Sequence, residues 1–353
     1  MKEFQDSLPQ GREFLFCGIL GVPTVIKAWE DEIEVHPQVV GYGDVIDSLI
    51  GLRYVDGYVK VSPEMIDTRT ILDGKIRALE EKGLGLKVSF LQEVGAREDM
   101  LDFVTNELAR FECALSYAYT KDGKVIMVTK AGAPLVSSDG VVALRSTVMK
   151  AFKKGGETVS MLPLYKGCHV GFGVRLIVTG DRERRRKFLA GLLLHAPECT
   201  VFTNATHLSY LRLNTTNCPH YVSYGRINGV LCRVLDGESE TDIHITHPDS
   251  SGNVYLLLSA LVEAGLMGVN YETILPDEVS ELTPTVISGL VRLPMSLKEA
   301  LNLAEGSGFL RRVLGDAFSN IYYTKVLKET KVFDTVASDE EYARYYSDLI
   351  KKC

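Results

Sequence analysis

The chain contains 353 residues, of which 46% are apolar and 24% are charged, and its formal net charge is −7. This composition is typical of a soluble globular protein, and the length indicates two domains rather than one compact unit. The negative charge argues against a broad nucleic-acid surface, and the lack of a run of ~20 apolar residues or of a signal-peptide core argues against a membrane protein.

The N-terminal part of the chain, residues 1–65, carries short β-rich runs separated by turn residues. Residues 62–83 then look like a connection that leads into a helix. We therefore expect a small β domain over residues 1–65 and a larger domain over residues 66–353.

Strands and helices alternate irregularly in the larger domain. Residues 85–94 read as a strand, and residues 253–269 are almost all apolar, which predicts a core helix. Helical spacing of apolar residues predicts helices at 98–111, 139–156, 185–197, 253–269, 296–305, 309–333 and 338–350. This pattern is typical of an α+β fold in which helices pack on a mixed or antiparallel sheet.

One arginine interrupts an apolar strand pattern. Residues 169–178 read HVGFGVRLIV, and Arg175 lies within their apolar run. A guanidinium stays charged in proteins and is costly to bury without a partner, so this position needs an explanation.

Two further features concern charge and redox state. The basic run from Arg182 to Lys187 opens the helix predicted at 185–197, which favours a solvated helix face over a phosphate-binding patch.

The seven cysteines include no C-x-x-C pair. Reduced, mostly buried thiols in a cytoplasmic protein therefore fit better than a disulfide framework or a zinc site.

Three segments carry a resemblance to a known family. Residues 191–213 read GLLLHAPECTVFTNATHLSYLRL, residues 221–234 read YVSYGRINGVLCRV, and residues 247–269 read HPDSSGNVYLLLSALVEAGLMGV. In residue order and spacing they resemble the catalytic domain of type I glutamine synthetases, and the resemblance extends over about residues 62–353. It implies a glutamine synthetase-like catalytic domain, an antiparallel sheet wrapped by helices, preceded by a small β-grasp-like domain.

The resemblance also implies a reaction and an assembly. Members of the family make an amide from glutamate and ammonia, with ATP passing through γ-glutamyl phosphate. They usually form stacked rings in which each active site lies between neighbouring subunits. The reaction needs ~2 divalent ions held by carboxylates and imidazoles.

Most of the carboxylates that the resemblance implies for these ions are missing. Glu93 keeps the first of two glutamates on one strand, and Gly95 stands at the second. Another glutamate pair of the family falls on Ala118 and Val125. One carboxylate is therefore left of the four.

Two other family ligands are replaced by basic residues. Arg175 stands where the resemblance places a metal-binding histidine, and His244 stands where it places a metal-binding glutamate. At ~4 Å and an effective dielectric near 20, each unit of like charge costs about 4 kcal/mol, so a guanidinium there repels a divalent ion. We expect no metal at this place.

Only some of the residues that the resemblance implies for binding substrate and nucleotide are present. Arg212 matches the arginine that clamps the glutamate carboxylate, and Asn217 falls at the flap position of a catalytic glutamate. Arg226 and Arg233 remain as candidates for contacting phosphate or nucleotide. No catalytic residue is assigned beyond the flap position.

Several site residues keep two interpretations. Arg175 either supplies positive charge for a metal-free anion pocket alongside Arg212 or forms a structural ion pair with a partner such as Glu93; we favour the pair. Asp242 and His244 share a strand face and with Glu93 would make a transition-metal site, but a hydrogen-bonded core histidine is the simpler interpretation.

Two glycines of the same stretch have alternative roles as well. Gly171 and Gly173 either let the backbone approach a substrate or serve a tight turn.

We therefore interpret the chain as a divergent archaeal- or bacterial-type paralogue of glutamine synthetase that is catalytically impaired. It would bind a small carboxylate ligand, or assemble with and regulate an active glutamine synthetase. The alternative is an active ATP-dependent carboxylate–amine ligase of the glutamate–ammonia type with a rebuilt site, which would use ATP and Mg²⁺ or Mn²⁺. A third possibility is a ligand-free structural subunit of a ring. In each case we expect a homo-oligomer or such a co-assembly, with no nucleic acid or membrane partner.

Overall fold

The computed structural model describes residues 13–18, 23–27, 32–35, 46–51, 58–61, 68–95, 115–121, 124–154, 163–165, 168–169, 171–215 and 219–335.

The small N-terminal strands form two separate sheets. The first five strands are β1 (Glu13–Gly18), β2 (Pro23–Lys27), β3 (Glu32–Val35), β4 (Ile46–Gly51) and β5 (Tyr58–Val61). They form an antiparallel sheet in the order β2-β1-β4 and a parallel pair, β3-β5. The β-grasp-like assignment and the boundary at residue 65 stay predictions.

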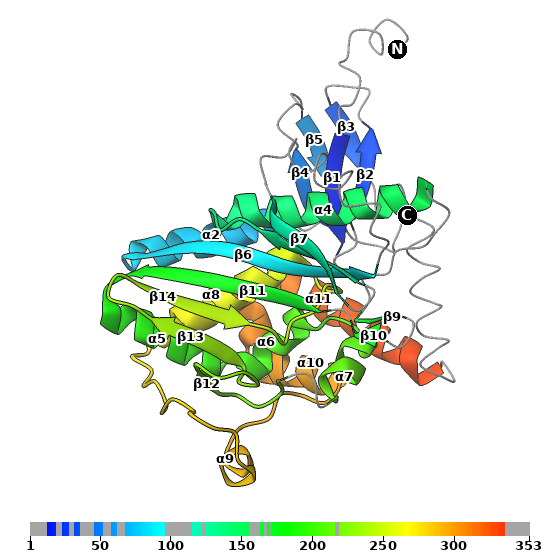
Figure 1. Ribbon diagram of the computed structural model, residues 1–353. Helices are drawn as coiled ribbons and strands as arrows, with labels where there is room; N and C mark the ends of the chain where they lie inside the picture. Colours follow the sequence, from blue (N-terminus) through cyan, green and yellow to red (C-terminus); the bar gives the residue numbers. More distant parts are fainter. Residues whose placement is uncertain are drawn as a thin grey trace, which may run out of the picture.

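A seven-stranded sheet lies at the centre of the molecule, in the order β12-β13-β14-β11-β6-β8-β7 (Figure 1). Its neighbours are antiparallel except for β12 and β13. The strands are β6 (Leu84–Gly95), β7 (Leu115–Lys121), β8 (Lys124–Thr129), β11 (Phe172–Gly180), β12 (Tyr224–Gly225), β13 (Cys232–Asp236) and β14 (Glu240–Ile245). A short hairpin, β9 (Leu164–Tyr165) and β10 (Cys168–His169), precedes β11.

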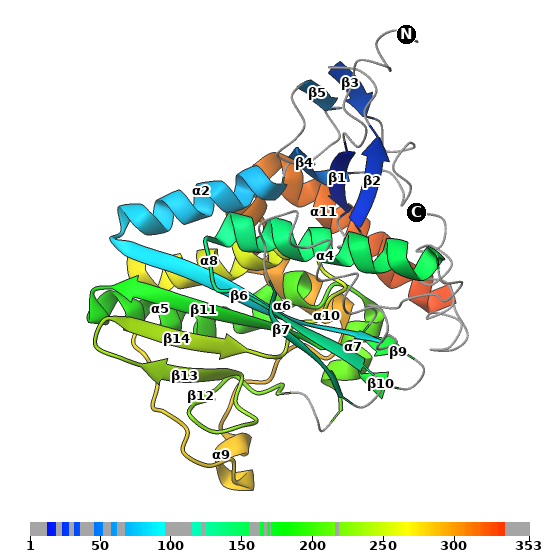
Figure 2. The ribbon, with the colours of Figure 1, turned by 45° about the horizontal axis from the view of Figure 1, so that its top comes forward.

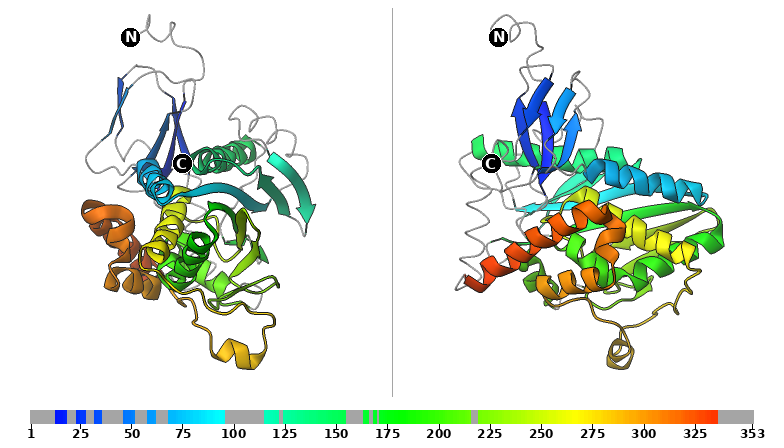
Figure 3. Two further views of the ribbon diagram at one scale, coloured as in Figure 1. Left: turned by 90° about the vertical axis from the view of Figure 1, so that its left-hand side faces the viewer. Right: turned by 180° about the vertical axis from the view of Figure 1, so that it is seen from behind.

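Helices pack against this sheet and confirm the α+β prediction. The described helices are α2 (Thr68–Glu81), α4 (Pro134–Lys154), α5 (Arg182–Leu194), α6 (Ala196–Thr203), α7 (His207–Leu213), α8 (Val254–Asn270), α9 (Pro284–Ser288), α10 (Leu297–Gly306) and α11 (Phe309–Thr335). Helices α5 and α8 lie behind β11, β14 and β13 in Figure 1 and in front of them in the rear view of Figure 3. Helices α2 and α4 run beside β6 (Figure 2).

The predicted helices match these elements, with two differences. The helix predicted at 185–197 ends at Leu194, and Pro197 lies in the first turn of the next helix, α6. Helix α8 is buried along almost its whole length, as its apolar sequence predicts, and Ser296 caps α10 by accepting a hydrogen bond from the Glu299 amide. The helix predicted at 309–333 is interrupted at Gly315, whose φ of 78° lies in the left-handed region that favours glycine. The helices predicted at 98–111 and 338–350 lie outside the described residues. None of the described helices is long and apolar enough to span a membrane.

Side chains alternate between the two faces of the central sheet. On β11, Val174 and Leu176 are buried on the face that packs against the helices, and Arg175 points to the other face. On β13, Cys232 is buried, whereas Arg233 is exposed. The strand predicted for the apolar run around Arg175 is thereby confirmed as β11. Its arginine lies on the face away from α5 and α8, which we call the outer face.

The basic run at the start of α5 is only partly the solvated surface that the sequence predicts. Arg182 and Arg184 are exposed, but the Arg185 side chain is 0% exposed. Its guanidinium donates to the Thr241 hydroxyl at 2.9 Å and to the carbonyl oxygens of Gly237 and Glu238. The prediction is wrong for Arg185, because the β13–β14 turn supplies acceptors that local sequence does not reveal.

Helices α5 and α8 touch through glycines. A Cβ atom built on Gly191 would lie 2.2 Å from the Ala264 carbonyl oxygen, and one on Gly268 would lie 2.1 Å from the Lys187 carbonyl oxygen. Both distances are far below van der Waals contact and involve backbone atoms, which have no other rotamer to adopt. The close crossing of these helices therefore requires glycine at both positions.

This crossing yields a stability prediction. The substitution Gly268→Ala should lower the free energy of unfolding by about 1–3 kcal/mol, because the added methyl group pushes the helices apart. Gly74→Ala on α2 is the matched control: nothing lies within 4 Å of its Cβ position, so it should stabilise by up to about 1 kcal/mol through helix propensity. Urea unfolding measures both, and equal effects at the two positions would contradict the role of the crossing.

Candidate functional site

Three basic side chains stand in one line across the outer face of the sheet. Arg233 on β13 is directly opposite His244 on β14, and His244 is directly opposite Arg175 on β11. We call these three residues the cross-strand row. Side chains in directly opposed positions lie ~5 Å apart at Cβ, so the row forms a continuous polar strip.

Arg175, at the β11 end of this row, forms an ion pair with Asp242. Arg175 donates from Nε to Asp242 Oδ1 at 2.9 Å and from Nη2 to Asp242 Oδ2 at 2.7 Å. The Arg175 side chain is 43% exposed and the Asp242 side chain 12% exposed. A two-pronged contact of this kind is the strongest geometry available to arginine and a carboxylate.

The structure therefore supports the ion-pair interpretation of Arg175 and gives Asp242 as a partner; a contact with Glu93 stays a prediction. Asp242 is paired with Ile177, two residues along β11 from Arg175, so the two charged residues are diagonal neighbours on one face. The alternating pattern of β14 already places Asp242 and His244 on one face. The register of β11 against β14 is the missing information that joins Arg175 to them.

Charge and burial set the protonation of this group. Burial by itself would raise the pKa of Asp242, but hydrogen bonds from Arg175 and the positive charges around it hold that pKa below its ordinary value. Burial lowers the pKa of His244, and the charges of Arg233 and Arg175 act in the same direction, against the carboxylate of Asp242. His244 Nε2 lies 3.2 Å from Asp242 Oδ1. His244 is thus hydrogen-bonded as expected, but its side chain is 27% exposed, so it is not the core histidine that the sequence favours.

Glu93 lies at the end of the outer face near the start of β11. Its carboxylate Oε2 accepts a hydrogen bond from the Gly171 amide at 2.8 Å. A Cβ on Gly171 would lie 3.4 Å from that carboxylate, and a Cβ on Gly173 would lie 3.3 Å from Leu91 Cβ. Gly173 thus lets β11 approach β6 closely, whereas a Cβ on Gly171 would make only ordinary van der Waals contact; contact of either glycine with a ligand stays a prediction.

These residues do not fit the divalent ions that the resemblance implies. Asp242 has both oxygens on a guanidinium, and Glu93 holds a backbone amide. Within the part of the chain that the structure describes, no group of three His, Cys, Asp or Glu side chains could hold a metal ion. A cation on this face would have to displace Arg175 from Asp242 and meet its charge.

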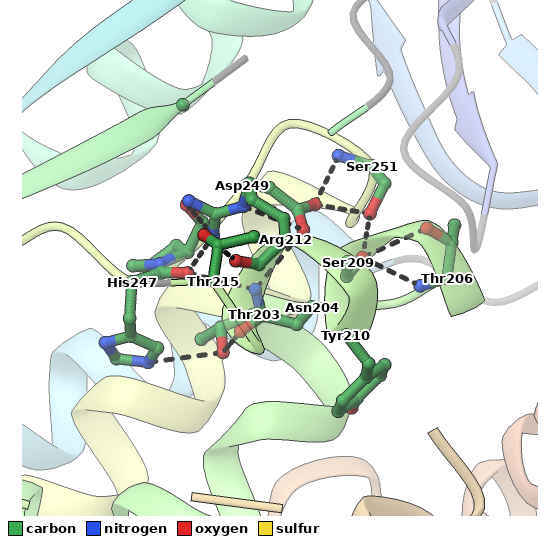
Figure 4. A network of polar contacts seen from close by, with 12 residues as sticks. Thr203, Asn204, Thr206, Ser209, Tyr210, Arg212, Thr215, His247, Asp249 and Ser251 are labelled. Carbon is green, nitrogen blue, oxygen red and sulfur yellow. Dashed lines mark hydrogen bonds and ion pairs between the residues drawn. The ribbon is translucent and has the colours of Figure 1, made fainter. Parts of the chain in front are cut away.

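Arg212 lies in a second, buried polar network (Figure 4). Its side chain is 6% exposed, and Nη2 donates to the backbone carbonyl oxygens of His247 and Pro248. Nε lies 4.0 Å from Asp249 Oδ2 and has no hydrogen-bond partner among the residues that the structure describes. The guanidinium therefore points at the protein's own backbone, and the predicted role of Arg212 in binding a substrate carboxylate stays a prediction.

The same network fixes the segment before α8. Asn204 donates to the His247 carbonyl oxygen at 3.0 Å and to Asp249 Oδ2 at 3.2 Å, and Asp249 also accepts from the amide of Ser251 at 2.9 Å. Burial lowers the pKa of His247 to about 3, and the charge of Arg212 adds to this effect. His247 is therefore a neutral core histidine, and its Nε2 lies 3.4 Å from the Thr203 hydroxyl.

The remaining predicted residues are Arg226, Arg233 and Asn217. Arg226 lies in the turn between β12 and β13, 3.7 Å from the Glu278 carboxylate. Arg233 belongs to the cross-strand row, and nothing tests the phosphate role predicted for the two arginines. Asn217 lies outside the described residues.

Comparison with known proteins shows which proteins this chain resembles. The family model of the glutamine synthetase catalytic domain matches residues 92–345. The glutamine synthetase of Frankia alni is 29% identical over 290 residues, which is 76% of this chain and 56% of that protein. The gamma-glutamylpolyamine synthetase of Streptomyces coelicolor is 25% identical over 241 residues, 60% of this chain and 52% of that protein. The chain thus spans about half the length of the curated relatives that it matches.

A solved structure gives the same result for the fold. A crystal structure described as a novel glutamine synthase homolog superposes with a TM-score of 0.67, covering 80% of this chain and 75% of the other. Sequence identity between the two is 18%, so this likeness concerns the fold alone.

The ion pair on the outer face yields a prediction for a double-mutant cycle. Arg175→Met and Asp242→Asn should each destabilise the protein, and the double variant should lose about 1 kcal/mol less than their sum. Arg226→Met with Glu278→Gln is the matched control, because that pair is longer and more exposed and should couple by less than about 0.5 kcal/mol. Urea unfolding measures all variants. Coupling no larger at Arg175 than at Arg226 would show that the two-pronged contact is absent in solution.

Proposed function

Because the chain belongs to the glutamine synthetase family, we propose that it is a member that does not carry out the metal-dependent ligase reaction and acts instead by binding. Its ligand would be a small carboxylate, or its partner an active glutamine synthetase that it regulates by co-assembly. A homo-oligomeric state and a cytoplasmic location belong to the same proposal.

The contact between Arg175 and Asp242 carries this proposal. The resemblance implies a metal-binding histidine at position 175, and this chain has there a guanidinium with its own carboxylate partner. A divalent cation bound by Asp242 while Arg175 stays beside it would place two positive groups close together. The pair thus supports a face whose charges are balanced by protein side chains without metal ions.

The position of Arg212 supports the same proposal from another side. The resemblance implies that this arginine clamps the substrate carboxylate, whereas here it is engaged by the carbonyl oxygens of His247 and Pro248. Binding a glutamate there would first require those contacts to break. A carboxylate ligand would therefore bind more readily to cations that are already exposed.

One comparison favours a second candidate, an ATP-dependent carboxylate–amine ligase with a rebuilt site. The relative from Streptomyces coelicolor is named for joining a γ-glutamyl group to polyamines. An enzyme of that class would accept an amine in place of ammonia. It would also still need ATP and Mg²⁺ or Mn²⁺, so the two candidates differ in a measurable requirement.

A phosphate-release assay tests the proposed function. The protein is incubated with ATP, glutamate, ammonium and Mg²⁺ or Mn²⁺, and free phosphate and glutamine are measured. We expect no glutamate-dependent release above that of the Glu93→Gln variant, since most metal-binding carboxylates implied by the resemblance are missing. A parallel incubation replaces ammonium by a polyamine.

The variant serves as the control for contaminating enzymes. Release that needs glutamate and ammonium and is abolished by Glu93→Gln would refute the proposal. Release that needs the polyamine and is abolished in the same way would establish the second candidate.

A further inference from the structure

The segment that joins α8 to α10 projects from the molecule, and we call its residues 271–293 the arm. The arm passes β12 at the edge of the central sheet, and its short helix α9 lies well below the sheet in Figures 1 and 2. None of the α9 residues is buried. Long connections with little secondary structure are uncommon in compact domains, and they are usually functional.

Hydrogen bonds tie the arm to the sheet on both sides of α9. The Val279 amide donates to the Tyr224 carbonyl oxygen at 2.9 Å, and the Tyr224 hydroxyl donates to the Pro276 carbonyl oxygen at 3.1 Å. On the return side, the Val222 amide donates to the Val291 carbonyl oxygen at 2.7 Å. The arm is thus held in one conformation, which reduces the entropy lost when a partner binds to it.

The arm exposes apolar side chains. Ile274 is 89% exposed, and Tyr271 and Val291 are each 61% exposed. No other large apolar side chain among the described residues is as exposed as these three. Single exposed apolar residues are ordinary, but their concentration in one projecting segment is typical of a contact with another protein.

Some charges of the arm are paired within the chain. Glu272 contacts Lys187 on α5, and the Glu278 carboxylate lies 3.7 Å from Arg226. These pairs neutralise two of the acidic side chains of the arm, so that the charges available to a partner are the remaining ones.

The remaining charges have both signs. Asp277 and Glu281 are exposed acids, and the exposed cations are Arg292 on the arm and Arg186 on α5. None of the four side chains forms a hydrogen bond or an ion pair with a residue that the structure describes. Burial raises the pKa of Tyr224, the charge of Arg186 opposes this shift, and the charge of Asp277 adds to it, so both charges lie near the Tyr224 hydroxyl.

A surface that carries unpaired charges of both signs is complementary to a second copy of itself. In a two-fold contact the same patch is used by both copies, so that each acid can meet a cation of the other copy. A partner of one charge sign would leave half of these charges facing a like charge, which is costly in an interface.

We propose that the arm is an interface between two copies of this chain, in which the acids of each arm face the cations of the other copy and the exposed apolar side chains lie between them. One side of a standard interface uses about 20–30 residues, which a segment of this length supplies. The inference rests on the homo-oligomeric state in the proposed function and deepens it by naming the surface.

Sedimentation equilibrium of the full chain tests this surface with two charge-reversed variants. Asp277→Arg with Glu281→Arg makes the unpaired charges positive, and Arg186→Glu with Arg292→Glu makes them negative. Each variant alone should self-associate about tenfold or more weakly than the unsubstituted chain, because like charges then face each other. An equimolar mixture of the two should associate again, because their signs are complementary.

Glu80→Arg with Glu81→Arg is the matched control. These exposed acids are on α2, above the sheet in Figure 1, whereas α9 lies below it, so their reversal should leave the association unchanged. All substituted positions are exposed, and circular dichroism checks that each variant is folded.

Three results would overturn the inference. They are an unsubstituted chain that stays monomeric at micromolar concentration, association that is equal in the variants, and folded variants whose mixture does not associate. Assembly that requires a different protein would assign the arm to that partner and also refute the contact between copies. The phosphate-release assay does not depend on the arm, so the proposed loss of ligase activity and this interface can fail separately.

Discussion

Arg175 reaches across β11 and β14 to hold both oxygens of Asp242, and the charge balance of the outer face depends on that contact. The carboxylate accepts two hydrogen bonds from a cation that cannot lose its proton, so it stays ionised and occupied. Burial and the charges of Arg233 and Arg175 lower the pKa of the neighbouring His244. A face at which the resemblance implies metal ions thereby has its charges balanced by the protein's own side chains.

The surrounding structure holds this face in place from behind. Helices α5 and α8 meet through Gly191 and Gly268 and bury the apolar side of β11, β14 and β13. Arg185 ties α5 to the turn between β13 and β14. With the strand register fixed in this way, the outward side chains have little freedom to change partners, and their chemistry follows from their place on the sheet.

Much of this fold is predictable from local patterns. Apolar spacing identifies β11 and the buried helix α8, and a serine followed by a glutamate identifies the start of α10. The family resemblance extends the prediction to the whole catalytic domain. Gly315 shows the limit of such patterns, because a single glycine within a helical pattern does not by itself predict an interruption of the helix.

The site is less predictable than the fold, because it depends on contacts between distant segments. Arg175 and Asp242 are 67 residues apart, and only the strand register brings them together. Local spacing cannot distinguish Asp242 from Glu93 as the partner of Arg175. Arg212 is a similar case: its motif predicts an outward, ligand-binding side chain, and the carbonyl groups of the loop before α8 draw it inward.

The central claim, that side chains have replaced metal ions on the outer face, is open to one direct measurement. Crystals grown with Mn²⁺ can be examined by anomalous diffraction at the manganese edge. The account predicts no anomalous peak within coordination distance of Glu93, Asp242 or His244, with Arg175 still on Asp242. A peak at that position, with the guanidinium displaced from the carboxylate, would contradict it.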